Sequence, residues 1–303
     1  TSIPEHIAKP PSFIIGGAPK SATTTLSRYL SRHTQVYMPE QEMNYYAFYE
    51  NTVAYKKLQI DHVENLESYQ SHFRLSPEQK DILCGEKSVS YLYEPWSDAI
   101  ITKIKRMHPN PEELKFIFIL RQPVERMYSQ YIFNCSFDED LPFTEAIEAW
   151  PSRNQENWLP AYDYVGASMY ANAIKKYQEN FKNVKVYLFD DLISDRKQLL
   201  NDLAEFLEIN PDEFMAMKEL NYNVGRIPEH PVAKQIHRVY KLKGFKKITN
   251  RWLSEKTKQK LKSNLFSKAM LDEQLRSTLA DQFREDIQQL ENLIGRDLKH
   301  WLI

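Results

Sequence analysis

The most constraining feature of this sequence is an apolar run that passes through two glycines into a lysine and several hydroxyl residues. Residues 12–26 read SFIIGGAPKSATTTL, and two of the seven glycines in the chain, Gly16 and Gly17, stand side by side there. Glycine lets backbone N–H groups turn around an anion. The start of the helix expected at 23–32 adds unpaired N–H groups and partial positive charge. The segment therefore predicts an anion-binding loop between a buried strand (12–16) and a helix.

The side chains of the same loop point to the same chemistry. Lys20 adds a full positive charge, and Ser21 is followed by three threonines at 23–25 that add hydroxyl donors. The simpler interpretation is an ordinary strand, turn and helix in which a serine or threonine caps the helix. That interpretation does not require a lysine within the turn, so we favour the anion-binding loop.

Buried strands alternate with helices along the first two thirds of the chain. Apolar runs predict strands at 12–16, 115–120 and 184–189, and apolar spacing predicts helices at 23–32, 123–134, 168–181 and 195–207. This order favours an α/β fold, with a parallel sheet flanked by helices. From residue 230 onward we expect no strand.

A helical C-terminal layer is expected over about 230–303, within a single domain of residues 1–303. The last long helix of that layer carries apolar residues at helical spacing, namely Leu271, Leu275, Leu279, Phe283, Ile287, Leu290 and Ile294. Such an apolar stripe is typical of a helix that docks on a core.

The loop does not have the pattern of an ATP-binding Walker A motif. That motif requires G-x-x-x-x-G-K-[ST], and alignment on Lys20 puts Ile14 and Pro19 in the two glycine positions. A Walker-type enzyme also needs an acidic residue after a neighbouring strand to hold Mg²⁺, but the strand KFIFIL runs into Arg121. No metal site is therefore expected. A loop cation and a second cation at a strand end suit a ligand with phosphates at two separate positions.

These segments resemble the two nucleotide motifs of the sulfotransferases that use 3′-phosphoadenosine-5′-phosphosulfate (PAPS). PSFIIGGAPKSATTTL is similar to the family's 5′-phosphosulfate loop, and FIFILRQPVERMYSQY is similar to its 3′-phosphate motif, in which an arginine and a serine eight residues later bind phosphate. The resemblance implies a P-loop NTPase-like sulfotransferase fold. It also implies donor contacts from Gly17, Lys20, Ser21, Ala22, Thr23, Thr24, Thr25, Arg121 and Ser129.

The resemblance also implies residues on the acceptor side. No histidine occurs between His72 and His108, where small-molecule sulfotransferases carry their base, so QEMNYYAF is compared with the glutamate motif of the glycan enzymes. Glu42 then becomes the general base, with Glu40 as a neighbouring competitor. In CGEKSVSYL, Lys87 would stabilise charge on the sulfuryl oxygens, together with Lys20. The simpler alternatives are that Glu42 is a solvated or helix-capping acid and that Lys87 forms a surface pair with Glu86.

Two features of the late sequence carry further predictions. LNYNVGRIPEHP occupies the place of the family's loop over the 3′-phosphate, so Gly225 and Arg226 are candidate donor contacts. Residues 241–268 carry ten lysines or arginines against one acid, Glu255. This basic strip is either a solvated face or a surface for an anionic acceptor or partner.

The composition of the chain bears on its binding partners and on its cellular compartment. The formal net charge of −1 gives no overall electrostatic attraction to nucleic acid or to a membrane. No apolar run is long enough to span a bilayer. The low count of two cysteines favours a reducing, cytoplasmic compartment. The predicted activity is transfer of a sulfuryl group from PAPS to a hydroxyl or amine of a small metabolite. A glycan O-sulfotransferase is the alternative, and a P-loop kinase or a non-catalytic nucleotide-binding protein is more remote.

Overall fold

The computed structural model describes residues 7–57, 60–218, 226–228, 266–268 and 271–302. Its centre is a five-stranded parallel sheet in the order β3-β5-β2-β6-β7. The strands are β2 (Phe13–Gly17), β3 (Val36–Tyr37), β5 (Leu83–Lys87), β6 (Lys115–Leu120) and β7 (Asn183–Leu188). Two antiparallel pairs join β1 (Ile7–Ala8) to β4 (Arg74–Leu75) and β8 (Arg226–Pro228) to β9 (Phe266–Lys268). The α/β class and the parallel sheet predicted from the sequence are confirmed.

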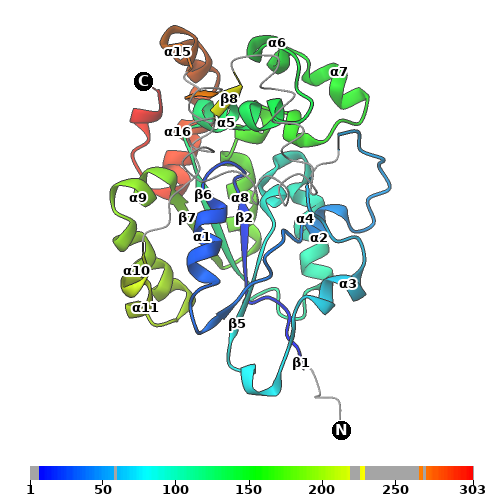
Figure 1. The fold of residues 1–303 in the computed structure, drawn as a ribbon, viewed down its shortest axis with the longest axis vertical. Helices are drawn as coiled ribbons and strands as arrows, with labels where there is room; N and C mark the ends of the chain where they lie inside the picture. Colours follow the sequence, from blue (N-terminus) through cyan, green and yellow to red (C-terminus); the bar gives the residue numbers. More distant parts are fainter. Residues whose placement is uncertain (1–6, 58–59, 219–225, 229–265, 269–270, 303) are drawn as a thin grey trace, which may run out of the picture.

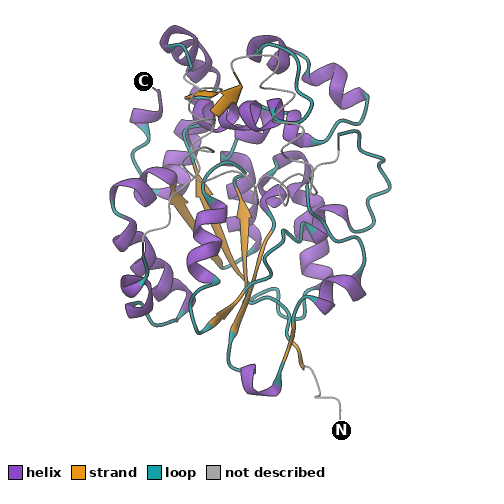
Figure 2. Cartoon of the chain, viewed as in Figure 1, coloured by secondary structure: helices purple, strands orange, loops and turns teal. Residues whose placement is uncertain are grey.

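Helices surround this sheet (Figures 1 and 2). The longer α-helices are α1 (Thr23–Leu30), α4 (Glu94–Met107), α5 (Pro123–Cys135), α8 (Ala171–Asn180), α10 (Arg196–Leu207), α15 (Glu273–Gln282) and α16 (Arg284–Ile294). The shorter ones are α2 (Tyr45–Phe48), α3 (Leu66–Ser71), α6 (Phe143–Glu148), α7 (Trp150–Gln155), α9 (Phe189–Ser194) and α11 (Asp212–Ala216). Short 3₁₀ turns lie at Pro77–Gln79, Val89–Leu92, Pro160–Tyr162, Gly166–Ser168 and Lys299–Leu302.

Alternation along the central strands divides the core into two layers. In β6, Phe116 and Phe118 pack on the face covered by α4, α8 and α16, whereas Ile117 and Ile119 pack on the face covered by α1 and α10. Successive side chains of a strand point to opposite faces, so a strand covered on both faces reads as a continuous apolar run. This is why KFIFIL and SFIIG could be recognised as strands from the sequence.

The strand β5 and the helix α4 were not predicted. Only Leu83 and Cys84 are apolar in β5, which ends in a buried glutamate and a buried lysine, Glu86 and Lys87. The charged residues interrupt the apolar run that identifies a covered strand. Their burial in a central strand indicates that they have a task other than packing.

The C-terminal segment docks on the sheet layer, but as two helices and not one. The chain leaves the helical conformation at Phe283, where φ is −98° and ψ is 0°, and this break separates α15 from α16. The apolar stripe is confirmed, because its residues pack in the same core as β6 and α8. Asp286 of α16 accepts hydrogen bonds from the backbone N–H groups of Tyr170 and Ala171 at the start of α8, at 2.9 and 3.0 Å. The bend at Phe283 allows α16 to reach α8.

The expectation of no strand after residue 230 was wrong for β9. A three-residue strand is too short to give a period-two pattern in the sequence. Of the predicted basic strip, residues 241–265 lie outside the described residues, and so does Gly225.

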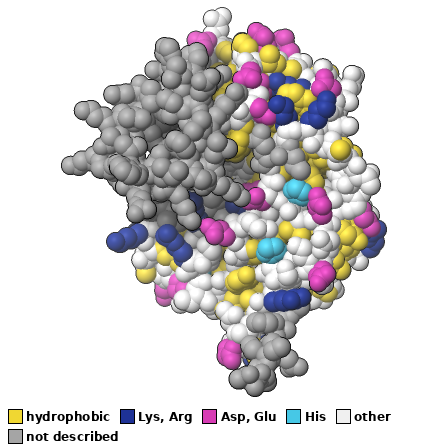
Figure 3. All heavy atoms as spheres, turned by 45° about the vertical axis from the view of Figure 1, so that its right-hand side comes forward, with side chains coloured by type: hydrophobic (Ala, Val, Ile, Leu, Met, Phe, Trp, Pro, Cys, Tyr) yellow, Lys and Arg dark blue, Asp and Glu magenta, His cyan; other side chains and the backbone are white. Residues whose placement is uncertain are grey.

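Figure 3 shows acidic and basic side chains interspersed on the described part of one face. Within the described ranges, no helix is both long enough and apolar enough to cross a bilayer. The cytoplasmic location stays a prediction.

Candidate active site

The candidate residues come from the carboxyl ends of four neighbouring strands. The glycine loop follows β2, Lys87 ends β5, Arg121 follows β6, and Glu42 lies five residues beyond β3. Because the strands are parallel, these ends meet at one edge of the sheet, which is where ligands bind in open α/β folds. The arrowheads in Figure 2 point to this edge, above which α5, α6, α7 and α15 lie in Figure 1.

The two adjacent glycines are required by close packing. A Cβ atom at Gly16 would lie 2.5 Å from the ring of Phe118, and one at Gly17 would lie 2.7 Å from Cβ of Leu92. Gly17 also has a φ of +149°, which side chains of L-residues rarely allow. The glycines therefore let the end of β2 lie directly against its neighbours.

The loop between β2 and α1 has the backbone geometry of an anion site. Lys20 and Ala22 have φ values of 66° and 70°, in the left-handed region. Left-handed residues among right-handed ones turn successive N–H groups toward one concave side, which suits an anion. The first backbone bonds of α1 run from Thr25 and Leu26 to the carbonyl of Ala22, so the preceding N–H groups lie at the open start of the helix.

A buried hydroxyl supports the same interpretation. Ser21 is fully buried, and within the described part of the chain its Oγ has no hydrogen-bond partner. A buried polar atom without a partner costs roughly 1–3 kcal/mol. A phosphate or sulfate oxygen in the loop would accept a hydrogen bond from this hydroxyl, so the loop fits the anion that the sequence predicts.

Lys87 joins the loop to the predicted base. Its Nζ lies 3.3 Å from Oε1 of Glu42 and 3.5 Å from the hydroxyl of Thr24 in the first turn of α1. The backbone holds the same two segments together, since Met43 N–H donates to the carbonyl of Lys87 at 3.0 Å. The surface pair between Lys87 and Glu86 that the sequence left open is absent from these contacts. Instead, Lys87 pairs with Glu42.

Arg121 contacts the other side of the loop. Its Nη1 donates to the carbonyl of Lys20 at 3.4 Å, and its guanidinium lies 4.9 Å from the ring centroid of Phe189. The Lys20 ammonium lies 4.2 Å from the ring centroid of Phe133 on α5. Ser129 is partly exposed on the same helix. The structure therefore brings Lys20, Arg121 and α5 together.

The sequence analysis missed Glu125, the ion-pair partner of Arg121, and Arg276, which pairs with Glu125. Glu125 pairs with Arg121 at 3.1 Å, and Arg276 of α15 pairs with the other oxygen of the same carboxylate. Gln122, next to Arg121, donates to the carbonyl of Trp301 at 2.8 Å. The spacing of Arg121 and Glu125 suggests a helical pair, but no sequence pattern indicates the C-terminal partners.

A buried carboxyl lies directly behind the site. Glu86 is fully buried and accepts hydrogen bonds from Tyr69 and from Ser88, the latter at 2.9 Å. Burial raises the pKa of Glu86 to about 7 from its usual 4.5, although hydrogen bonds from Tyr69 and Ser88 oppose the rise. Because this pKa is higher in the folded state, Glu86 stabilises the fold below about pH 4.5, and that contribution is lost as the pH rises through about 7.

We expect Glu86→Gln to flatten the pH dependence of stability, because an amide stays neutral at all pH values. The melting temperature of the wild type should fall more steeply than that of the variant between about pH 4.5 and 7. Thermal melts across that range measure the difference. Glu67→Gln on the exposed side of α3 is the control. Parallel curves for wild type and Glu86→Gln would contradict the raised pKa.

His33, which follows α1, connects two backbone segments. It is buried, its Nε2 bonds to the carbonyl of Asn210 at 2.8 Å, and its Nδ1 accepts from Gln35 N–H at 3.2 Å. Both ring nitrogens thus hold backbone segments together.

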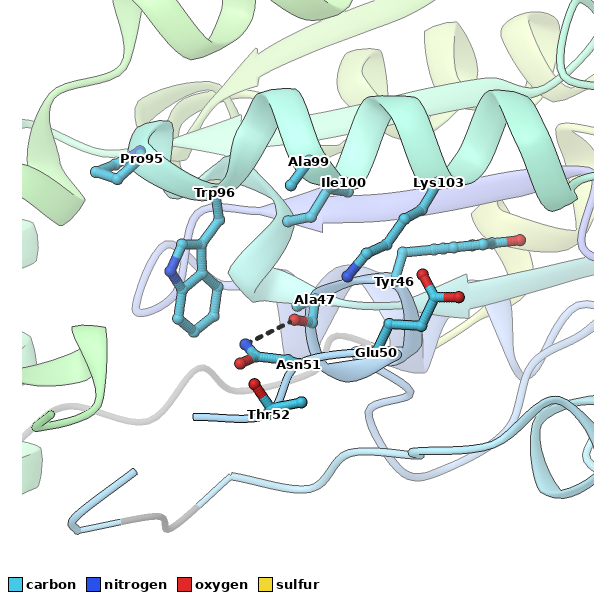
Figure 4. Close-up of a pocket in the computed structure, with 10 residues that line it drawn as sticks. All are labelled: Tyr46, Ala47, Glu50, Asn51, Thr52, Pro95, Trp96, Ala99, Ile100 and Lys103. Carbon is cyan, nitrogen blue, oxygen red and sulfur yellow. Dashed lines mark hydrogen bonds between the residues drawn. The ribbon is translucent and has the colours of Figure 1, made fainter. Parts of the chain in front are cut away.

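A surface pocket of about 260 Å³ lies between α2 and α4 (Figure 4). Its lining consists of Tyr46, Ala47, Glu50, Asn51, Thr52, Pro95, Trp96, Ala99, Ile100 and Lys103. Figure 4 shows Lys103 pointing from α4 toward α2, where its ammonium donates to the carbonyl of Tyr49. The lining shares no residue with the predicted site.

Metal ligands do not cluster in the part of the chain that the structure describes. No group of three or more His, Cys, Asp or Glu side chains there is arranged to hold a metal ion.

Comparison with known proteins adds a family and a fold. Residues 11–213 match the model of a family described as the sulfotransferase family. A protein of Dictyostelium discoideum described as the membrane-associated sulfotransferase kil1 is 30% identical over 126 residues, which are 41% of this chain and 23% of that protein. The matched part thus spans about a quarter of that relative. A crystal structure of a sulfotransferase from Alicyclobacillus acidocaldarius superposes with a TM-score of 0.70 over 97% of this chain and 99% of the other, at 23% identity. At that identity the superposition shows the fold.

Proposed function

The chain belongs to the sulfotransferase family, and from that premise we propose that it transfers a sulfuryl group from PAPS to a hydroxyl or amine of a small metabolite. The observation that carries the proposal is the position of Lys87 between two groups. Its ammonium touches both Thr24, at the start of the anion-binding loop's helix, and Glu42, the candidate base. A group that contacts both sides in this way lies where donor and acceptor would meet.

We assign the donor to the loop and to the end of β6. The loop's N–H groups, the buried hydroxyl of Ser21 and the charge of Lys20 suit the 5′-phosphosulfate. Arg121 suits the 3′-phosphate, because a guanidinium offers paired donors to phosphate oxygens. The full set of proposed donor contacts is Gly17, Lys20, Ser21, Ala22, Thr23, Thr24, Thr25, Arg121, Ser129, Gly225 and Arg226.

We assign the chemistry to Glu42, Lys87 and Lys20. As the acceptor oxygen or nitrogen bonds to sulfur, it must lose its proton, and Glu42 takes that proton. The bond between sulfur and the bridging phosphate oxygen breaks, and 3′-phosphoadenosine-5′-phosphate leaves. Lys87 and Lys20 stabilise the negative charge that builds up on the transferring group and on the leaving oxygen.

The acceptor is proposed as a small metabolite, with a glycan as the alternative. The test is a mass-spectrometric screen with PAPS against panels of phenols, alcohols, amines and oligosaccharides. A mass increase of one sulfuryl group on a small molecule supports the proposal. Sulfation confined to oligosaccharides would support the glycan alternative.

We expect selective stabilisation by the desulfated donor. 3′-Phosphoadenosine-5′-phosphate has anionic groups at two separate positions, as the loop and Arg121 require, so it should raise the melting temperature by mass action. ATP with Mg²⁺ should raise it far less, because Arg121 follows β6 where an ATPase has a metal-binding acid. Thermal shift titrations measure both. Equal stabilisation by the two nucleotides would contradict PAPS as the donor.

We also expect sulfuryl transfer to survive metal chelation. The charge on the donor is met by Lys20, Lys87 and Arg121 in this proposal, so turnover should be nearly the same with and without EDTA. Initial rates in metal-stripped buffer test this. Loss of turnover that Mg²⁺ restores would favour a kinase-like reaction.

A further inference from the structure

Asn44 has every hydrogen-bonding position of its amide in use beside the candidate base. It is fully buried, and its Nδ2 donates to Oε2 of Glu42 at 3.3 Å and to the carbonyl of Asp61 at 2.8 Å. Its Oδ1 accepts from the N–H of Ser90 at 3.3 Å and from the Ser90 hydroxyl at 2.6 Å. An amide offers two donors and two acceptor positions, so the side chain is held in one orientation.

The backbone of Asn44 is equally constrained. Its φ is 44°, in the left-handed region, which asparagine tolerates better than most residues. Its N–H donates to the hydroxyl of Ser88 at 2.9 Å, and that hydroxyl donates to the buried Glu86. Asn44 is therefore anchored to the segment that directly follows Lys87, the last residue of β5.

The two oxygens of Glu42 are consequently held from two sides. Oε1 lies 3.3 Å from Nζ of Lys87, and Oε2 lies 3.3 Å from Nδ2 of Asn44. The Lys87 ammonium would also contact the transferring sulfuryl group, so its contact with Glu42 can change during the reaction. Asn44 is buried and its side chain bonds to Glu42, Asp61 and Ser90, so it can fix the orientation of the Glu42 carboxylate from the protein interior.

We propose that Asn44 is a positioning residue that orients the Glu42 carboxylate for proton abstraction. The inference rests on the proposed function, because it requires Glu42 to be the base. A catalytic group must be held close to its productive geometry, and a misplacement of about 1 Å costs roughly 100-fold in rate. Asn44 supplies that constraint from the protein interior.

The test is a double-mutant cycle between positions 44 and 42. Asn44→Asp keeps the shape, the left-handed backbone and the acceptor for Ser90. It replaces the amide nitrogen that donates to Glu42 and to the carbonyl of Asp61 with a carboxylate oxygen. It should lower kcat by roughly 10–100-fold in the wild-type background. In the Glu42→Gln background, the same change should alter kcat by no more than about twofold, because its target is gone. Affinity for 3′-phosphoadenosine-5′-phosphate should stay unchanged in all four proteins.

Two further variants keep the test decisive. Asn44→Gly removes the amide without adding a charge and retains the left-handed conformation. It too should lower kcat in the wild-type background and change kcat little in the Glu42→Gln background. Asn65→Asp is the matched control, since Asn65 is exposed and caps α3 through its side-chain oxygen, and it should match the wild type.

The outcomes separate this inference from the proposed function. If Glu42→Gln retains wild-type kcat, the base assignment itself fails. If Glu42→Gln is impaired and Asn44→Asp lowers kcat equally in both backgrounds, Asn44 acts on stability or packing and the positioning role is overturned. Failure of both Asn44 variants to fold would likewise assign Asn44 to stability and overturn the proposal.

Discussion

Glu42→Gln should lower kcat by about 10²–10⁴-fold while leaving the affinity for 3′-phosphoadenosine-5′-phosphate nearly intact. Glutamine has the size and hydrogen-bonding shape of glutamate but cannot take a proton from the acceptor. Its amide oxygen can still face Lys87, which contacts Glu42 at 3.3 Å in the wild type. Steady-state kinetics with a fixed acceptor and nucleotide binding by calorimetry measure the two quantities separately.

Glu40→Gln is the matched control for this variant. Glu40 lies two residues away and is exposed, and it should have wild-type kcat. If the two variants behave alike, the base has been assigned to the wrong residue. If Glu42→Gln loses nucleotide binding, Glu42 supports the donor site, and its role is not proton transfer.

Arg121→Ala should weaken donor binding by roughly 1.5–3 kcal/mol, which is about 10–150-fold in the apparent KM for PAPS. The guanidinium is half-buried against Phe189 and the carbonyl of Lys20, so its phosphate contact would be partly shielded from water. Because the contact is made to the donor both before and during transfer, kcat should change less than KM. Initial rates across donor concentrations measure this.

The 3′-phosphate itself provides a control for the arginine. Wild-type protein should bind 3′-phosphoadenosine-5′-phosphate far more tightly than adenosine-5′-phosphate, which lacks that group, and Arg121→Ala should remove most of the difference. Arg284→Ala changes an exposed arginine that is paired with Asp281. This variant should keep the difference in affinity between the two nucleotides. Unchanged discrimination in Arg121→Ala would make Arg121 a structural partner of Glu125.

The sequence predicted the parts of this fold that have a local signal. A covered strand such as β6 reads as a continuous apolar run, and the two helices that follow β2 and β6 begin after recognisable loop or proline signals. The resemblance of these segments to sulfotransferase motifs indicated the family, which the family match confirms. The roles of Lys20, Arg121 and Ser129 within that family remain proposals.

The parts that escaped prediction depend on distant contacts. Glu86 and Lys87 interrupt the apolar pattern of β5, and their burial makes sense only once Tyr69, Ser88 and Glu42 are in place around them. Asn44 gave no signal either, because a left-handed asparagine in a loop is common, and its partners lie in other segments. The break at Phe283 is equally invisible, since the apolar stripe continues through it.

The bond from Gln122 to the carbonyl of Trp301 has a consequence for how the protein is made. The two residues are 179 positions apart in the chain, and Gln122 is adjacent to Arg121. Domains begin to fold while their N-terminal parts emerge from the ribosome, so the sheet and the glycine loop have the chance to form early. The support beside Arg121 cannot be completed until residue 301 has left the exit tunnel. A nascent chain would therefore complete the support beside Arg121 only after the sheet and the glycine loop have emerged.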